Sequence, residues 1–475
     1  MSQTDVLIVG GGISGLSLAW WLSQQGVRVE IWEADERIGG KIKSTRQDGY
    51  LTERAASMLM NFRPEVTELL HDTGLDTAKS SRLPGAEAKR YLLHNKQLTA
   101  MPMRLGGMIT SPLWSLRGKL RLLAEPFIPP RYRQDETVSQ FITRRLGREM
   151  LEKAMEPFVA GTLAANPDLA SAAACLPRLT ALERKYGSIT ADVLINRLLR
   201  KRTACGTETF SFNGGMQTLV ETLARTPNVQ IATRFQVTEL ERKTKGWQIT
   251  ANTPDGERVL RASQVVVTTP ASKAAQLVAP LNKKLARLLR DIQYAPVNIV
   301  HMGFDRTAID HALDGTGFLI PRNALSKENQ ALTGNLWMSS LFANRAPDAK
   351  VLLSSYIGGA RMPEVQDWDT EQCLHTTLSG LTHLLGIKAE PEMVKIDRHK
   401  EALPLYHGAH QARMQAIAAH LQHIPGLHLE ANYRGGVSVR DRIARSRIVA
   451  KQIMASLPKS ALASALFAPV LRPNY

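Results

Sequence analysis

The chain has 475 residues, of which 44% are hydrophobic and 22% charged, and its formal net charge is +17. This length exceeds what one compact core needs and predicts two or three domains of an ordinary globular protein, and no uninterrupted apolar stretch is long enough to span a membrane. The three cysteines, Cys175, Cys205 and Cys373, lie far apart without CxxC spacing, which argues against a zinc or iron–sulfur site and against a disulfide scaffold, and fits a reducing cytoplasm.

The excess of positive charge favours an anionic partner, a class that includes nucleic acids, membrane surfaces and acidic substrates. Basic residues gather in 131–149 and 196–202, but no helix-turn-helix, zinc-finger or RNA-binding signature accompanies them. We therefore expect no nucleic-acid partner, and charge alone does not choose between the other two classes.

The first predicted elements form a βαβ unit. Val6–Val9 is a short buried strand, Ser14–Gln25 is a helix that ends at Gly26, and Val27–Trp32 alternates as a second strand. No Lys or Arg precedes Arg28, and glycines and serines interrupt the apolar run, so we expect this segment to belong to the folded protein and not to a secretory signal.

The turn after the first strand has the spacing Gly10-x-Gly12-x-x-Gly15, and Glu33 closes the second strand about 20 residues further on. In a dinucleotide site the first glycine makes a tight turn, the second lets the backbone approach a pyrophosphate, and the third lets the helix pack on the strand. The unpaired N–H groups of the helix N-terminus then face the phosphates, and Glu33 can accept hydrogen bonds from ribose hydroxyls. The pattern predicts a bound dinucleotide.

The segment that follows, ADERIGGKIKS, favours FAD over a nicotinamide cofactor. Arg37, Gly39 and Gly40 come directly after the ribose acid, and this arrangement resembles the extension that wraps the FAD phosphates in flavoproteins. The chain here resembles the FAD-dependent superfamily that includes amine oxidases, phytoene desaturases and protoporphyrinogen oxidases.

Two later segments predict further pieces of the nucleotide-binding domain. Residues 228–251 and 264–270 have strand patterns that return to the first sheet, and Gly214-Gly215 precedes a helix. Residues 427–453 repeat the arrangement of strand, glycine turn and helix. Between these pieces we expect a helical, basic stretch and a mixed stretch of strands and helices.

Within the helical stretch, four leucines recur at helical spacing, with Arg117, Lys119 and Arg121 toward the other side: Leu113, Leu116, Leu120 and Leu123. Such a helix suits an anionic bilayer surface, and it equally suits a domain helix that buries its leucines and exposes its basic face. The C-terminal segment 460–471 is open to the same two interpretations.

Several segments resemble the protoporphyrinogen oxidase family more closely than its superfamily relatives, and they occur in the family's order from end to end of the chain: FSFNGGMQTLVETLA, EPFVAGTLAANPDLAS, ALERKYGSIT, YAPVNIVHMGF, GTGFLIP, SSLFANRAPDAKVLLSSYIGGAR, ALPLYHGAHQARM and ANYRGGVSVRDRIA. The resemblance implies an enzyme that removes six electrons from a reduced tetrapyrrole in FAD-mediated steps, usually while attached to a membrane face. Because the flavin supplies the reactivity, neither a metal nor a catalytic triad is expected.

The resemblance also implies the residues of the FAD site. It places the cofactor against the backbone of Val237 and against Gly10, Gly11, Gly12, Ile13, Ser14, Gly15, Glu33, Ala34, Arg37, Gly40, Lys41, Ala55, Ala56, Ser57, Met58, Val437, Ser438 and Val439.

For the substrate, the resemblance implies that Arg90 meets a propionate, that Leu319, Leu336 and Tyr356 sandwich the macrocycle, and that the backbone of Gly161 lies beside it. A flat apolar ring needs aliphatic and aromatic walls, and its carboxylates need a forked cation. Without the resemblance, we would expect Arg90 to be a solvated surface residue and the two leucines to be ordinary core residues.

Alanines stand where relatives have glycine, at Ala55-Ala56 after Arg54, at Ala164-Ala165 and at Ala431. Their methyl groups could narrow the pocket. This narrowing affects the prediction of the substrate more than the prediction of the cofactor. Protoporphyrinogen IX is the substrate that we expect, and the alternatives are oxidation of coproporphyrinogen III or the activity of another flavin oxidase of the amine oxidase superfamily. The alternative of a different class is a basic surface-binding protein with a vestigial nucleotide fold.

The expected fold is mixed α/β with three domains. An FAD-binding Rossmann-like domain comprises 1–75, 206–285 and 395–475; a mixed-sheet substrate domain comprises 76–95 and 286–394; and a helical domain, which faces the membrane in relatives, comprises 96–205. Oxygen or a quinone is the expected electron acceptor, and the expected location is cytoplasmic, with peripheral contact to the anionic cytoplasmic membrane face.

Overall fold

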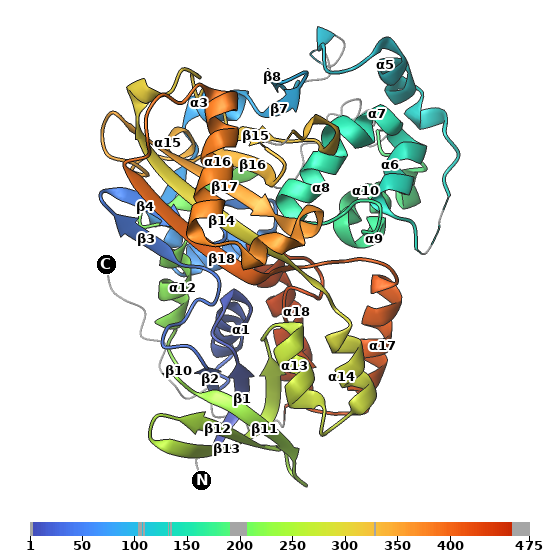
Figure 1. Cartoon of the computed structure of the whole chain (residues 1–475). Helices are drawn as coiled ribbons and strands as arrows, with labels where there is room; N and C mark the ends of the chain where they lie inside the picture. Colours follow the sequence, from blue (N-terminus) through green and yellow to red (C-terminus); the bar gives the residue numbers. More distant parts are fainter. Residues whose placement is uncertain are drawn as a thin grey trace.

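The computed structural model describes residues 3–102, 107, 110–131, 133, 135–190, 207–326 and 329–457. Cys205 and the segments 196–202 and 460–471, which the sequence singles out, lie outside the described residues. Two seven-stranded sheets and a group of helices make up the described part, with the first sheet in the lower half of Figure 1, the second at the upper left and the helices α5–α10 at the upper right.

The first sheet joins strands from three separated parts of the chain. Its order is β10-β2-β1-β13-β12-β11, with β19 beside β13. The strands are β1 (Gln3–Val9), β2 (Val29–Glu33), β10 (Val229–Thr233), β11 (Gln236–Arg242), β12 (Trp247–Thr253), β13 (Gly256–Val267) and β19 (Leu427–Leu429). Because β10 and β13 pair in parallel with β2 and β1, the later segments return to the N-terminal unit, as the sequence pattern predicts.

Both faces of this sheet are covered by helices, which is why its central strand is an unbroken apolar run. Val6 and Ile8 of β1 belong to a core with one group of helices, while Leu7 and Val9 belong to a core with another. The first group is α1 (Ile13–Ser23), α2 (Pro64–Asp72), α12 (Gln217–Ala224) and α18 (Val439–Ser456); the second is α13 (Ala271–Val278), α14 (Lys283–Arg290) and α17 (His410–Gln422).

The N-terminal βαβ unit has the predicted elements with small shifts at their ends. Helix α1 ends at Ser23, two residues before the predicted end, and Gly26 then takes the left-handed conformation in the turn that leads to β2. Helices α1 and α18 pack together through buried polar contacts, since Trp21 Nε1 donates to the carbonyl of Ile443 at 3.2 Å and the hydroxyls of Ser17 and Ser446 lie 3.0 Å apart.

The second sheet has the order β18-β14-β17-β16-β15-β7-β8. Its strands are β7 (Tyr91–His94), β8 (Gln97–Ala100), β14 (Tyr294–Asp305), β15 (Gly317–Leu319), β16 (Leu332–Trp337), β17 (Lys350–Gly358) and β18 (Met393–Pro404). Helix α16 (Thr370–Leu385) covers one face, where Val300, Met302 and Phe304 are buried. The alternate residues of the same strand, Val297 and Ile299, line a cavity on the other face.

Two small sheets lie between the large ones. They pair β3 (Ser44–Gln47) with β4 (Tyr50–Glu53), and β9 (Glu208–Phe212) with both β5 (Leu59–Asn61) and β6 (Lys79–Ser81). Glu53 and Arg345 form a fully buried ion pair at this junction, with Glu53 Oε1 2.7 Å from Arg345 Nη1.

The helical part comprises α5 (Leu116–Leu123), α6 (Val138–Leu146), α7 (Arg148–Met150), α8 (Glu156–Leu163), α9 (Ala172–Cys175) and α10 (Pro177–Tyr186). The sequence predicts that the four leucines at 113–123 share one helix. That prediction is wrong for Leu113, which is buried ahead of the helix because Ser115 caps α5 and starts it at Leu116.

A buried ion-pair network holds the helical part together. Arg145 is 0% exposed and donates to Glu125, which also accepts hydrogen bonds from the backbone of Ile189 at 2.9 Å and from the hydroxyl of Ser188 at 2.6 Å. Burial opposes the charge of Glu125, but these bonds and those from Thr190 outweigh it and lower the pKa of Glu125 to about 2. Glu125 therefore ties α6 to the chain that precedes it and to residues 188–190.

Glu125→Ala should destabilise the helical part by about 3–5 kcal/mol, because it leaves the buried Arg145 guanidinium with only its longer contact to Glu183, at 3.6 Å. The amides of Phe127, Ile128 and residues 188–190 should lose protection in hydrogen-exchange mass spectrometry. The matched control is Glu152→Ala, whose carboxylate pairs with Arg148 at the surface and should contribute only about 0–1 kcal/mol. Equal protection in the two variants would contradict the role given to Glu125.

Because the pKa of Glu125 is lowered from 4.5 to about 2, its contribution should be complete above the unfolded value near pH 4.5 and should be lost as the pH falls toward 2.

Candidate active site

A cavity of about 1700 Å³ lies between the two large sheets and the helical part. Its lining includes the ends of β1 and β2, the strip Ala55–Met58, the turn that leads into α18, the cavity face of the second sheet and helix α8. The predicted FAD-site and substrate-site residues therefore face one continuous space.

The glycine turn after β1 is built for close backbone approach. Gly10 has φ +110°, and a Cβ there would lie 2.7 Å from Thr268 Oγ1, while a Cβ on Gly15 would lie 2.2 Å from the carbonyl oxygen of Gly10. Helix α1 therefore starts directly on the turn, with its N-terminus toward the cavity. Gly12 and Gly40 pack backbone to backbone beside it, since a Cβ on Gly40 would lie 3.2 Å from the Cα of Gly12. This cradle suits the pyrophosphate of a dinucleotide.

Glu33 stands at the carboxyl end of β2 and lines the same cavity. One carboxylate oxygen accepts the backbone N–H of Gly11 at 2.6 Å, and the other accepts the N–H of Asp35 at 2.9 Å. These bonds hold the carboxylate between the glycine turn and the loop after β2, which is where the ribose of a bound dinucleotide would need an acceptor.

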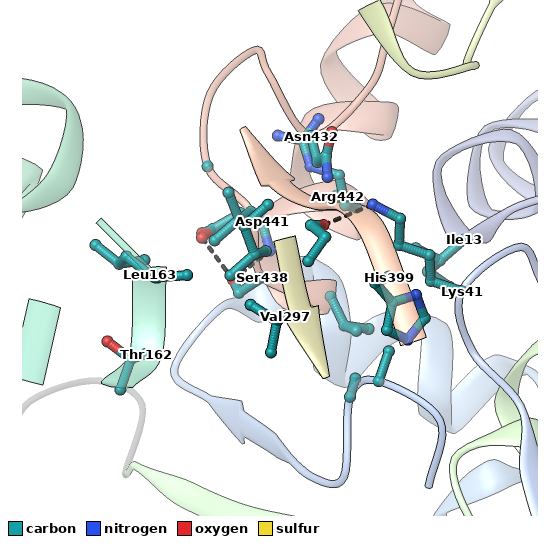
Figure 2. A pocket seen from close by; sticks show the side chains of 18 of the residues that line it. Ile13, Lys41, Thr162, Leu163, Val297, His399, Asn432, Ser438, Asp441 and Arg442 are labelled. Carbon is teal, nitrogen blue, oxygen red and sulfur yellow. Dashed lines mark hydrogen bonds between the residues drawn. The ribbon is translucent and has the colours of Figure 1, made fainter. Parts of the chain in front are cut away.

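A second helix N-terminus faces the cavity. Val437, Ser438 and Val439 line it, and Ser438 caps α18 by accepting the N–H of Asp441. Figure 2 shows Ser438 beside Asp441, with Lys41 and His399 to one side and Thr162 and Leu163 of α8 to the other. The positive ends of α1 and α18 both favour an electron-rich ligand in this space.

Lys41 and His399 form the wall opposite α8. Lys41 Nζ donates to the carbonyl of Ala402 at 2.6 Å and to that of Glu401, and burial lowers the pKa of Lys41 to about 8. His399 Nε2 lies 2.7 Å from the carbonyl of Arg54, and burial also lowers the pKa of His399. The wall thus places a lysine ammonium and an imidazole that is neutral at pH 7 beside Ala55 and Ala56.

Of the predicted FAD residues, all but three line the cavity; the three are Gly11, Gly15 and Arg37. Arg37 lies behind the lining, where its guanidinium donates to the carbonyls of Ile38 at 2.9 Å and Ile42 at 3.1 Å. In this position Arg37 braces the loop that carries Gly40 and Lys41.

The predicted substrate residues come together through strand register. Leu319 of β15 pairs with Gly334 of β16, which pairs with Tyr356 of β17, and Leu336 follows two residues along β16 on the same face. Arg90 directly precedes β7, the strand beside β15. These four side chains line the cavity from one sheet.

Helix α8 lies opposite these four side chains and closes the space beside them. We call this part of the cavity, between α8 and the second sheet, the slot. A Cβ on Gly161 would lie 2.4 Å from Leu319 Cδ2, so the helix backbone approaches the sheet at this point because no side chain intervenes. Phe158, one turn earlier on α8, also lines the cavity and is 41% exposed, and sequence reasoning missed it. The signal was present, because Phe158 and Gly161 are three residues apart in a helix and share a face.

Arg90 is the polar group at the end of the slot. Its guanidinium makes no hydrogen bond or ion pair with the residues that the structure describes, and burial together with the charge of Arg82 lowers its pKa. Arg82 lines the cavity too, and sequence reasoning missed it because nothing local distinguishes it from other basic residues. A partly buried cation that faces an apolar cavity is suited to a carboxylate ligand.

Of the five alanines that the family resemblance places at glycine positions, Ala55, Ala56, Ala164 and Ala431 line the cavity and Ala165 does not. Ala164 ends α8 with φ +51°, the left-handed conformation that favours glycine, and its carbonyl accepts the N–H of Ala360 at 2.8 Å. These methyl groups form part of the wall around the space for cofactor and substrate.

The fold and the cradle define a flavin-binding oxidoreductase. The model of the family described as "Flavin containing amine oxidoreductase" matches residues 13–453, and the chain belongs to that family. FAD is therefore its cofactor, and the glycine cradle, Glu33 and the two helix N-termini fit such a group.

Curated relatives match most of the chain. It is 30% identical to protoporphyrinogen oxidase 1 of Spinacia oleracea, over 92% of this chain and 81% of the relative, and 29% identical to protoporphyrinogen oxidase 2 of Arabidopsis thaliana, over 94% and 92%. It is 26% identical to coproporphyrinogen III oxidase of Bacillus subtilis, over 94% and 97%.

A crystal structure from Exiguobacterium sp. 255-15 shares the fold, with a TM-score of 0.78 at 24% identity over 96% of this chain and 99% of that one.

Glu33→Ala should release FAD during purification, because each charged hydrogen bond to the ribose contributes about 1.5–3 kcal/mol. The ratio of flavin absorbance to protein absorbance after gel filtration measures the retention. Glu36→Ala is the control, since Glu36 is exposed and its carboxylate lies 3.6 Å from Arg234 at the surface. Full flavin retention in the Glu33 variant would count against the assignment of Glu33.

Proposed function

We propose that this protein oxidises a porphyrinogen, and that protoporphyrinogen IX, converted to protoporphyrin IX, is its substrate. The observation that carries the proposal is the slot between α8 and the second sheet, with apolar walls at Leu319, Leu336 and Tyr356 and the guanidinium of Arg90 at its end. Curated relatives that act on porphyrinogens, matched over nearly the whole chain, support it.

The chain's own residues would bind, orient and shield the macrocycle. When bound, the flavin supplies the hydride acceptor, so the protein needs no nucleophile of its own. The walls hold a flat ring in one plane, Arg90 fixes its rotation through a propionate, and the close packing of Gly161 on Leu319 limits the width of the slot. Burial raises the pKa of Tyr356 to about 12, so this side chain stays neutral against the ring.

Coproporphyrinogen III is the alternative, since relatives of comparable identity act on it by name. It carries four carboxylates where protoporphyrinogen carries two. The apolar side chains of Leu319, Leu336 and Phe158 suit the vinyl-bearing edge, and Arg90 with Arg82 nearby suits a single edge that carries two propionates. Feeding each porphyrinogen to the purified protein and following porphyrin fluorescence distinguishes the two.

Arg90→Ala should lose a charged hydrogen bond of about 1.5–3 kcal/mol, so kcat/KM should fall roughly tenfold to a hundredfold while FAD stays bound. Arg90→Lys should recover only part, because an ammonium cannot reproduce the planar fork. Stopped-flow reduction of the flavin by protoporphyrinogen measures both variants.

The control for Arg90 is Lys89→Ala, because Lys89 is exposed, pairs with Asp314 and does not line the cavity. If Arg90→Ala reduces its flavin at the parent rate with the same half-saturating substrate concentration, Arg90 has no part in binding.

We further propose that helix α5 rests on an anionic membrane surface. Its polar side is attached to the protein, since Ser115 bonds to Glu149 and Arg121 Nη1 donates to the carbonyl of Arg145 at 3.2 Å. Its leucines point outward, and the side chains of Leu116, Leu120 and Leu123 are 73%, 58% and 68% exposed. Burying them in a bilayer interface would remove this apolar surface from water.

The residues just before α5 adjoin the slot. Leu113 and Trp114, just before α5, pack with Leu92 and contact Leu319 and Met101. No helix in the described residues is long and apolar enough to cross a membrane. The location that fits the proposal is peripheral, on the cytoplasmic membrane face.

Leu116→Glu combined with Leu120→Glu should release the protein from anionic vesicles, because the helix would no longer have an apolar face. The variant should stay folded, since both side chains are exposed. Vesicle sedimentation at rising salt measures the association, which should weaken as surface charges are screened. Leu113→Glu is the contrasting change: this side chain is 1% exposed, so the substitution should destabilise the fold. If the double variant sediments with vesicles like the parent, α5 is not the contact.

A further inference from the structure

The cavity is larger than one ligand needs. Its volume of about 1700 Å³ exceeds the range of roughly 300–1,000 Å³ for single-ligand pockets, as a space for both cofactor and macrocycle must. Part of its lining belongs to neither the cradle nor the slot. This part, the α9–α13 branch, lies between helices α9 and α10 on one side and α13 and α17 on the other. Its lining includes Ala174, Cys175, Ala181, Gln276, Leu277 and Met414.

The branch runs from the surface to the turn before α18. At the outer end Ala181, Lys273 and Gln276 are exposed, while Cys175 lies further in. At the inner end, the backbone N–H of Ser171, just before α9, donates to the carbonyl of Tyr406 at 2.8 Å. Tyr406 also lines the cavity, and its hydroxyl donates to the carbonyl of Asn432 at 2.5 Å.

Asn432 and Val437–Val439 line the cavity within the same turn before α18, and the family resemblance places Val437–Val439 against the flavin. The branch thus reaches the flavin position past α9 and α17, whereas the slot reaches it past α8 and the second sheet. A macrocycle held by Arg90 and Tyr356 would occupy the slot and leave the branch open.

Electron balance requires a second reactant. On the proposed function, on which this inference rests, each macrocycle loses six electrons in three steps. Each step delivers two electrons that an acceptor must take up with two protons, so that oxygen becomes hydrogen peroxide or a quinone becomes a hydroquinone. Three acceptor molecules are needed for each macrocycle.

We propose that the α9–α13 branch admits this acceptor, a small uncharged two-electron oxidant, while the macrocycle stays in the slot. Apolar side chains, among them Ala174, Leu277 and Met414, form one part of its wall, and this part suits an uncharged molecule. Polar and basic side chains, among them Arg184, Lys273 and Gln276, form the other part. Separate access would let all three oxidations proceed without release of a partly oxidised intermediate.

The first test narrows the branch and does not depend on turnover. Ala181→Trp places an indole at its outer end, and Arg178→Trp places one on the same helix at an exposed position outside the lining. In a Cys205→Ser background, Cys175 is the thiol to be labelled, since Cys373 is 0% exposed. Burial raises the pKa of Cys175 to about 12, so maleimide labelling should be slow and is best followed at raised pH.

Ala181→Trp should slow labelling of Cys175 about tenfold, the equivalent of about 1.4 kcal/mol, while Arg178→Trp should leave it unchanged. Unchanged labelling in both variants would mean that no open branch exists and would overturn the proposal.

The second test follows the acceptor. Dithionite-reduced protein is mixed with a water-soluble benzoquinone or with oxygen, so the result does not depend on the porphyrinogen reaction. Ala181→Trp should slow reoxidation by the quinone about tenfold and by oxygen less, because oxygen is smaller. Saturating protoporphyrin should leave the parent's reoxidation rate unchanged.

If protoporphyrin blocks reoxidation, or if Ala181→Trp slows reduction by porphyrinogen instead, the acceptor shares the slot and the proposal fails. If neither porphyrinogen reduces the flavin of the parent, the proposed function fails, and the labelling and reoxidation results still report on the branch.

Discussion

The buried ion pair between Glu53 and Arg345 joins the parts of the chain on which the cavity depends. Both side chains are almost fully buried, and the cost of removing two charges from water is offset by further bonds. Glu53 also accepts the N–H of Met216 at 2.9 Å and the hydroxyl of Ser44 at 2.7 Å, and Arg345 donates to Ser211. The pair thus links β4, β9, the start of α12 and the loop before β17, directly beside the strip 54–58 that lines the cavity.

Because this junction holds the two large sheets together, the site is formed from residues far apart in the chain. The first sheet contributes strand ends and the N-terminus of α1, which are suited to phosphates and ribose. The second sheet contributes one flat face, opposite α16, and that face is suited to an apolar ring. Neither sheet alone encloses the cavity, and the close packing of α8 on Leu319 completes it.

The cradle could be predicted from sequence because its determinants are local. Gly10, Gly12 and Gly15 lie within one turn, and Glu33 closes the adjacent strand, so spacing alone predicts their juxtaposition. Leu319 and Tyr356 meet only through the register of three strands, which no spacing reveals, and they were found by resemblance to a family. Arg82 had neither signal, and Phe158 had only its helical spacing from Gly161. The leucines near 116 showed the limit of periodicity, since the pattern identifies a face but not what covers it.

The basic residues behind the net charge of +17 do not all lie at the surface. Arg145, Arg345 and Arg442 are buried and paired with Glu125, Glu53 and Glu430, so part of the basic content stabilises the fold and does not face solvent. Among the other cations, Arg90 and Lys273 line the cavity, while Arg117 and Lys119 lie on α5. On the function and the acceptor route proposed above, an acidic substrate and an uncharged oxidant would reach one cavity by different approaches, which would let one bound macrocycle be oxidised repeatedly.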